Sequence, residues 1–165
     1  MGRLSPVLID VDERGDVRMW SRHGTGLTAR LGALPDRFAC VPPGTVFDGE
    51  LVAIGERGGQ AVQDFAAVTR AIFTGDPLAT ERPSFVAFDV LRLAGENLRA
   101  RPWHERRDHL HQALPVDDRV RLISSQPATP EAHAAIVALG FEGHRAQAPR
   151  AASSSTSVAS SAERA

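Results

Sequence analysis

Lysine is missing from this chain of 165 residues, and all 19 of its basic residues are arginine. The guanidinium group of arginine stays protonated under ordinary conditions, so arginine cannot replace a lysine amine as a nucleophile. The absence therefore excludes chemistry that depends on a lysine side chain of this chain. Tyrosine is also absent and Asn97 is the only asparagine, a bias that GC-rich coding DNA is expected to produce.

Cysteine and long apolar runs are scarce too. Cys40 is the single cysteine, so the chain forms no internal disulfide. Residues 1–6 lack the apolar run of roughly 7–15 residues that a signal peptide requires. The longest apolar stretch, residues 134–141, is far shorter than the roughly 20 residues that span a bilayer.

A net charge of -1 gives no basic field of the kind that a dedicated nucleic-acid-binding domain shows. We expect a cytoplasmic protein that does not contact a membrane.

The order of apolar runs and turn residues predicts an α+β domain, a mainly antiparallel sheet with packed helices. The expected strands form a hairpin over residues 7–21 and two β-rich runs over residues 45–54 and 84–93. We expect one helix after Asp64 as N-cap, a second over residues 103 to about 113 that Pro102 opens, as proline does at the first helical position, and a third over residues 131–139. Residues 148–165 are rich in alanine and serine and predict a disordered tail after a domain of residues 1–147.

The tripeptide Asp48-Gly49-Glu50 is the most informative segment for chemistry. Alternation along a strand places Asp48 and Glu50 on one face, where the two carboxylates are suited to accept a hydrogen bond from a ribose hydroxyl or to help hold a divalent metal. The same tripeptide is also typical of a plain turn that leads into a strand. From these residues alone, the turn is the preferred interpretation.

Segments on both sides of this tripeptide extend the pattern. Residues 21–24 (Ser-Arg-His-Gly) precede it, and residues 85–91 (Phe-Val-Ala-Phe-Asp-Val-Leu), 95–98 (Gly-Glu-Asn-Leu), 106–107 (Arg-Arg) and 139–143 (Leu-Gly-Phe-Glu-Gly) follow it. In this order and spacing, the segments resemble the adenylation domain of ATP-dependent DNA ligases, within the covalent nucleotidyltransferase superfamily that includes RNA ligases and capping enzymes. The resemblance covers about residues 7–143. It implies a partial DNA ligase/mRNA-capping nucleotidyltransferase (ATP-grasp-like) domain and, as the family activity, ATP-driven sealing of DNA nicks in repair and recombination.

The resemblance assigns roles to four residues. Glu50 matches the glutamate of motif III, which contacts the ribose of the nucleotide, and Phe88 matches the aromatic residue of motif IIIa, which stacks on adenine. Arg22 matches the arginine of the Arg-x-Gly motif, which lies near the ribose and the nick phosphate. Glu142 matches the glutamate of motif IV, which helps to bind the catalytic metal, Mg²⁺. Without the resemblance, Phe88 would be interpreted as a core aromatic residue and Arg22 as an exposed charge.

The family's first step uses a lysine that this sequence does not contain. That lysine, in a Lys-x-Asp-Gly-x-Arg motif, attacks the α-phosphate of ATP; AMP then passes to the 5′-phosphate of a nick, and the 3′-hydroxyl displaces it. When Val7 is aligned with the strand that follows the motif, the motif falls on residues 1–6, Met-Gly-Arg-Leu-Ser-Pro. We therefore expect this chain, a ligase domain truncated at both ends, to be unable to adenylate itself. Two explanations stay open: a working ligase whose lysine lies upstream of Met1, or a chain that binds ATP or DNA non-covalently or has no function.

Two further clusters have structural interpretations. The spacing of His104, His109 and His111 is not that of a zinc site, and a solvated helix face is preferred. Four arginines, at positions 99, 101, 106 and 107, are candidates for contacts to a DNA backbone. Their pairing with the acidic residues Glu96, Glu105 and Asp108 is the preferred interpretation.

Overall fold

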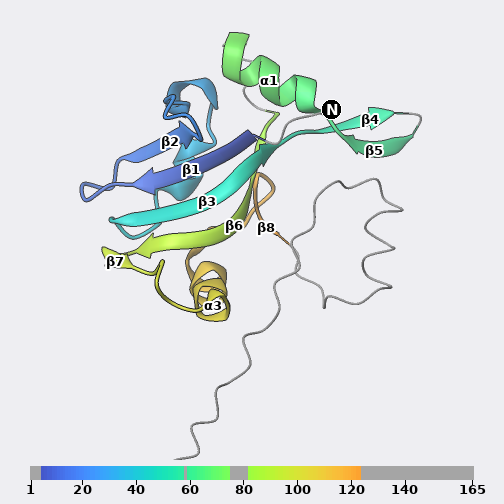
Figure 1. The fold of residues 1–165 in the computed structure, drawn as a ribbon. Coiled ribbons are helices and arrows are strands. Elements are labelled where there is room, and N and C mark those ends of the chain that lie inside the picture. The colour runs from blue at the N-terminus through green and yellow to red at the C-terminus, as the bar shows by residue number, and fades with distance from the viewer. Residues whose placement is uncertain (1–4, 58, 75–81, 124–165) are drawn as a thin grey trace, which may run out of the picture. The chain divides into compact units, whose positions relative to one another are not determined.

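The computed structural model describes residues 5–57, 59–74 and 82–123, which lie in one structural unit, Met1–Ile123. Figure 1 shows the elements of this unit. The strands are β1 (Ser5–Val11), β2 (Val17–Ser21), β3 (Thr45–Val52), β4 (Ile54–Arg57), β5 (Gln60–Gln63), β6 (Ser84–Leu93), β7 (Glu96–Asn97) and β8 (Val120–Leu122). The helices are α1 (Phe65–Thr74) and α3 (Trp103–Ala113), with two short 3₁₀ turns, η1 (Thr28–Arg30) and η2 (Pro35–Phe38).

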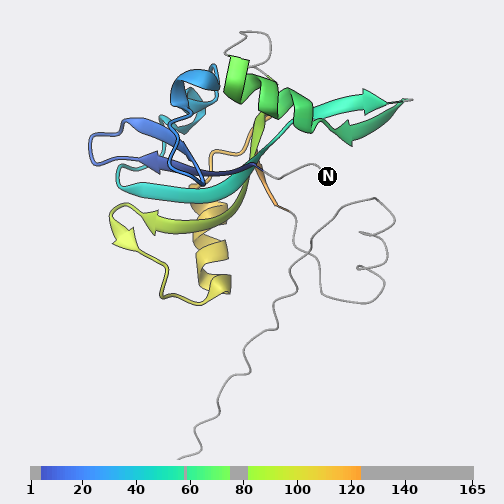
Figure 2. The same ribbon diagram turned by 45° about the horizontal axis from the view of Figure 1, so that its top comes forward.

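A mainly antiparallel sheet is the centre of the fold. Its strand order is β2-β1-β3-β6-β7, and β8 pairs with β6 in parallel; β4 and β5 form a separate hairpin. Figures 1 and 2 show α3 beside β6 and the two 3₁₀ turns beside β2. The architecture confirms the α+β expectation. It includes the expected hairpin, formed by β1 and β2, and the two β-rich runs, which correspond to β3 and β6.

The core lies against one face of the sheet, the face to which alternate residues of β1, β3 and β6 point. Ile9, Phe47 and Phe85 are fully buried on three neighbouring strands. Phe38 of η2 closes over them, with its ring centroid 6.0 Å from that of Phe47 and 5.9 Å from that of Phe85. Leu110 of α3 joins the same cluster. The helix and the 3₁₀ turns thus cover one face of the sheet, and the residues between the core positions point to the other face.

The two helices begin in different ways. As expected, Asp64 caps α1: its Oδ1 accepts a hydrogen bond from the backbone N–H of Ala67 at 2.9 Å. The helix expected over residues 103 to about 113 is confirmed as α3, but Pro102 does not occupy its first helical position, because its ψ of 148° is extended. Pro102 is instead the N-cap residue, and its carbonyl accepts a hydrogen bond from the N–H of Arg106 at 3.2 Å.

Gly49 lies inside β3, so the interpretation of Asp48-Gly49-Glu50 as a turn is wrong. A Cβ atom at Gly49 would meet the carbonyl oxygen of Val86 at 2.4 Å and the ring of Phe85 at 2.5 Å. The glycine is needed because the neighbouring strand and its aromatic ring approach the backbone closely. Asp48 and Glu50, on either side of this glycine, therefore lie on one continuous strand.

Candidate functional site

A row of residues crosses three strands at one end of the sheet and brings Arg22 and Glu50 close together. The backbone N–H of Arg22, just after β2, donates to the carbonyl of Pro6 at 3.2 Å. Pro6 pairs with Glu50, and Glu50 pairs with Val86 on β6. Since neighbouring strands lie about 4.8 Å apart, the backbones of Arg22 and Glu50 are separated by about 10 Å. Arg22 is exposed, which leaves its side chain accessible to a ligand over this end of the sheet.

Phe88 lies at a β-bulge of β6, close to this row. Asp48 pairs with Asp89 and Gly49 pairs with Ala87, so Phe88 is the extra residue that has no partner on β3. A bulge locally redirects side chains relative to the regular alternation. Phe88 is half-buried and does not belong to the core cluster. The ring is therefore not a core aromatic and keeps part of its surface available.

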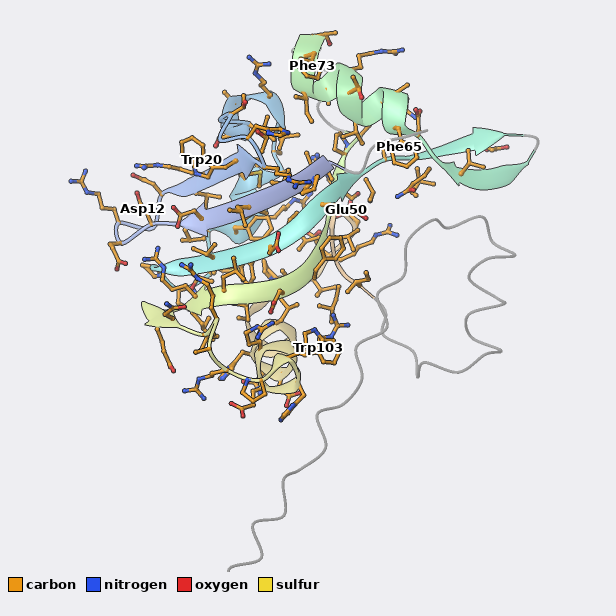
Figure 3. The ribbon with its side chains drawn as sticks, viewed as in Figure 1. Asp12, Trp20, Glu50, Phe65, Phe73 and Trp103 are labelled. Atoms are coloured by element: carbon orange, nitrogen blue, oxygen red, sulfur yellow. The ribbon has the colours of Figure 1, made fainter. Side chains whose placement is uncertain are left out.

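Glu50 is the most unusual side chain of the site. It is only 9% exposed, and its Oε2 atom has no hydrogen-bond partner among the residues that the structure describes. Burial raises the pKa of the Glu50 carboxyl, because the charged form loses hydration. A buried oxygen without a partner is costly, and a hydroxyl donor from a ligand would satisfy it. Figure 3 shows Glu50 at the end of β3 that leads into β4.

Asp48 and Asp89 face each other across β3 and β6. Burial raises the pKa of the Asp48 carboxyl, and the negative charge of Asp89 raises it further. Asp89 is held by Arg106 of α3, whose Nε lies 2.9 Å from Oδ1 and whose Nη2 lies 2.7 Å from Oδ2. The sequence interpretation missed this pair, because Asp89 and Arg106 are 17 residues apart and only the fold brings them together.

The other arginines near α3 follow the expected pairing only in part. Arg101 forms ion pairs with Glu96 and Glu105, as expected. Arg107 has no acidic partner on its own helix; it is buried and donates to the carbonyl of Ile123. The prediction was wrong for Arg107, because that side chain points into the contact between α3 and the end of β8.

His104 and His111 are exposed, in agreement with a solvated helix face.

The described residues do not provide a complete magnesium site. No group of three or more His, Cys, Asp or Glu residues in the described ranges could hold a metal ion. Asp48 and Asp89 offer two carboxylates, but Arg106 already occupies that of Asp89. Glu142, the expected metal ligand, lies outside the described residues, as do residues 139–143, the expected third helix and the boundary after residue 147.

Comparison with known proteins identifies the family of this chain. The ATP dependent DNA ligase domain matches residues 3–140. The chain belongs to this family. Two similar curated proteins are each named a probable DNA ligase: that of Streptomyces griseus subsp. griseus is 34% identical over 138 residues, and that of Mycolicibacterium vanbaalenii is 31% identical over 154 residues. The matches cover 81% and 90% of this chain but only 27% and 29% of these ligases.

Solved ligase structures share the fold. The ligase domain of LigD from M. tuberculosis matches with a TM-score of 0.60 and 27% identity. A mycobacterial DNA ligase D complexed with ATP and MES matches with a TM-score of 0.61 and 29% identity. Each match covers 87% of this chain and 44% of the ligase structure. The α+β fold is thus that of a ligase nucleotidyltransferase domain. Among the residues that the structure describes, no helix has the length and apolar character needed to cross a membrane.

Proposed function

We propose that this chain supplies the adenosine-binding face of an ATP-dependent DNA ligase, and that nicked DNA is the substrate of that ligase. The Oε2 atom of Glu50 carries the proposal, because it is buried without a partner in the described ranges and lies on the same sheet end as Arg22 and Phe88. The family membership and the ATP bound to one structurally similar ligase support it. Repair and recombination in the cytoplasm are the setting that we propose for this activity.

Each residue has a role that suits its chemistry. Glu50 accepts a hydrogen bond from a ribose hydroxyl, which satisfies its unpaired Oε2 atom. Phe88 stacks on adenine, and base stacking on an aromatic ring contributes about 1–3 kcal/mol. Arg22 lies near the ribose and the nick phosphate. Glu142 helps to hold Mg²⁺, for which its carboxylate oxygens are suitable ligands.

Titration of the protein with ATP in a calorimeter tests the adenosine site. We expect measurable binding, and we expect Phe88→Ala to weaken it by about fivefold, the lower end of the stacking energy. Phe73→Ala is the matched control, because Phe73 is an aromatic residue that is 74% exposed on α1. Absence of binding at millimolar ATP, or equal losses in the two variants, would contradict the site.

The absence of lysine leads to a second prediction, for the first chemical step. The step needs an amine that forms a phosphoramidate with AMP, and this polypeptide has no lysine to supply it. We therefore propose that the 165-residue polypeptide binds ATP without becoming covalently adenylated. Intact-protein mass spectrometry after incubation with ATP and Mg²⁺ checks this, with an active ATP-dependent ligase treated in parallel as the positive control. A gain in mass equal to one AMP would overturn it.

A further inference from the structure

The edge of β6 away from β3 is interrupted beside Phe88. On that edge β8 pairs with residues 85–87, and β7 pairs with Arg92 and Leu93. Between β8 and β7, no strand in the described part of the chain pairs with this edge of residues 88–90. The backbone N–H of Val90 donates to Oδ1 of its neighbour Asp89 at 2.9 Å. The bulge at Phe88 therefore lacks the support of a second strand.

Arg106 of α3 binds the residue that follows the bulge. Its guanidinium holds both carboxylate oxygens of Asp89, and its Nη1 donates to the carbonyl of Arg101 at 2.7 Å. The two paired side chains are only 16% and 18% exposed, which shields the pair from solvent. A two-pronged bond between arginine and carboxylate fixes orientation as well as distance. The residue directly after the bulge is thus tied to a helix that is itself packed on β6.

We propose that Arg106 is a positioning residue of the nucleotide site: by holding Asp89, it fixes the bulge that directs Phe88 toward the adenine. The inference rests on the stacking role proposed for Phe88. Arg106 does not touch the nucleotide in this arrangement. Its effect on ATP affinity passes through the backbone of residues 88 and 89.

A competing explanation is electrostatic. Asp48 faces Asp89, so removal of Arg106 would leave two carboxylates without a compensating charge near a site for an anionic ligand. Three variants separate the two explanations. Arg106→Lys keeps the charge but loses the planar two-pronged geometry. Arg106→Met loses both, and the double variant with Asp89→Asn and Arg106→Met removes both charges at once.

The experiment measures ATP affinity for the wild type and these variants, each with and without Phe88→Ala. If Arg106 positions Phe88, all three lose about as much affinity as Phe88→Ala does, roughly fivefold. None of them weakens binding further when Phe88 is already alanine, because residues that act as one unit are not additive. Retained affinity in Arg106→Lys and in the uncharged double variant would overturn the proposal in favour of charge alone.

Two further readouts keep the inference separate from the proposed function. Arg101→Met is the matched control, because it removes an exposed arginine from the same region, and we expect its ATP affinity to equal that of the wild type. The ring resonances of Phe88, assigned by comparison with Phe88→Ala in protein with labelled phenylalanine, report its position without any nucleotide. We expect them to shift or broaden in Arg106→Lys and to stay unchanged in Arg101→Met. Unchanged Phe88 resonances in Arg106→Lys would overturn the positioning role, whereas absence of ATP binding in the wild type would overturn the proposed function.

Discussion

Gly49→Ala is expected to destabilise the protein by about 2–3 kcal/mol, the upper part of the range for overpacked core positions. The reason is geometric, because the added Cβ would lie 2.4 Å from the carbonyl oxygen of Val86 and 2.5 Å from the ring of Phe85. A carbonyl oxygen of a paired strand cannot move without breaking the register of β3 with β6. Urea unfolding followed by circular dichroism measures the loss.

Two comparisons make this prediction specific. Of the described residues, a Cβ at Gly26 would meet only the Trp20 side chain, at an ordinary 3.8 Å, so Gly26→Ala should change stability by no more than about 0.5 kcal/mol. When Phe85→Leu is combined with Gly49→Ala, the total loss should be smaller than the sum of the single losses, because the ring contact is relieved. The relief stays incomplete, since the Val86 carbonyl remains. A Gly49→Ala protein as stable as Gly26→Ala would show that the strands do not approach as closely as described.

The strands were predictable because their signal is local. Residues 84–93 form a β-rich run bounded by turn residues, and the structure has β6 with the same limits. Asp64 likewise indicated the start of α1 through its capping chemistry. By contrast, the tripeptide around Gly49 was ambiguous from the sequence. The need for a glycine comes in part from Phe85, which lies on another strand and meets Gly49 only after folding.

The candidate site was predictable only through the family resemblance. The sequence places Glu50 on a strand, but nothing local shows that its Oε2 is buried without a partner. The bulge at Phe88 arises from the mismatch in register between two strands, and the pair of Asp89 and Arg106 joins a strand to a helix. These features depend on contacts between distant segments, so periodicity and spacing carry no signal for them.

Glu50→Gln is expected to stabilise the free protein while it weakens ATP binding. Burial raises the pKa of the Glu50 carboxyl, so the ionised form is less favourable in the folded state than in the unfolded state. This penalty is absent below the ordinary pKa of glutamate, about 4.3. It grows as the pH rises toward the raised pKa and is complete above it. At neutral pH, the variant should gain about 1 kcal/mol, equivalent to about 2–4 °C in the midpoint of thermal unfolding for a chain of this length.

The pH dependence isolates Glu50 from the other carboxyl groups, because wild type and Glu50→Gln differ at this one group. Their difference in unfolding free energy should vanish near pH 4 and reach its full size at neutral pH. A stabilisation of the same size at pH 4 would show that shape, not charge, is responsible.

ATP titration of the same variant gives the opposite sign. The ionised carboxylate forms a charge-assisted hydrogen bond with the ribose hydroxyl, whereas the neutral amide offers a weaker acceptor. Hydrogen bonds to charged groups contribute about 1.5–3 kcal/mol, so we expect Glu50→Gln to lose at least about tenfold in ATP affinity. A site built for a ligand tolerates a buried, unpaired charge that the free fold would be better without. Higher stability together with unchanged ATP affinity would mean that Glu50 does not bind the ribose, and the adenosine would then have to lie elsewhere on the sheet.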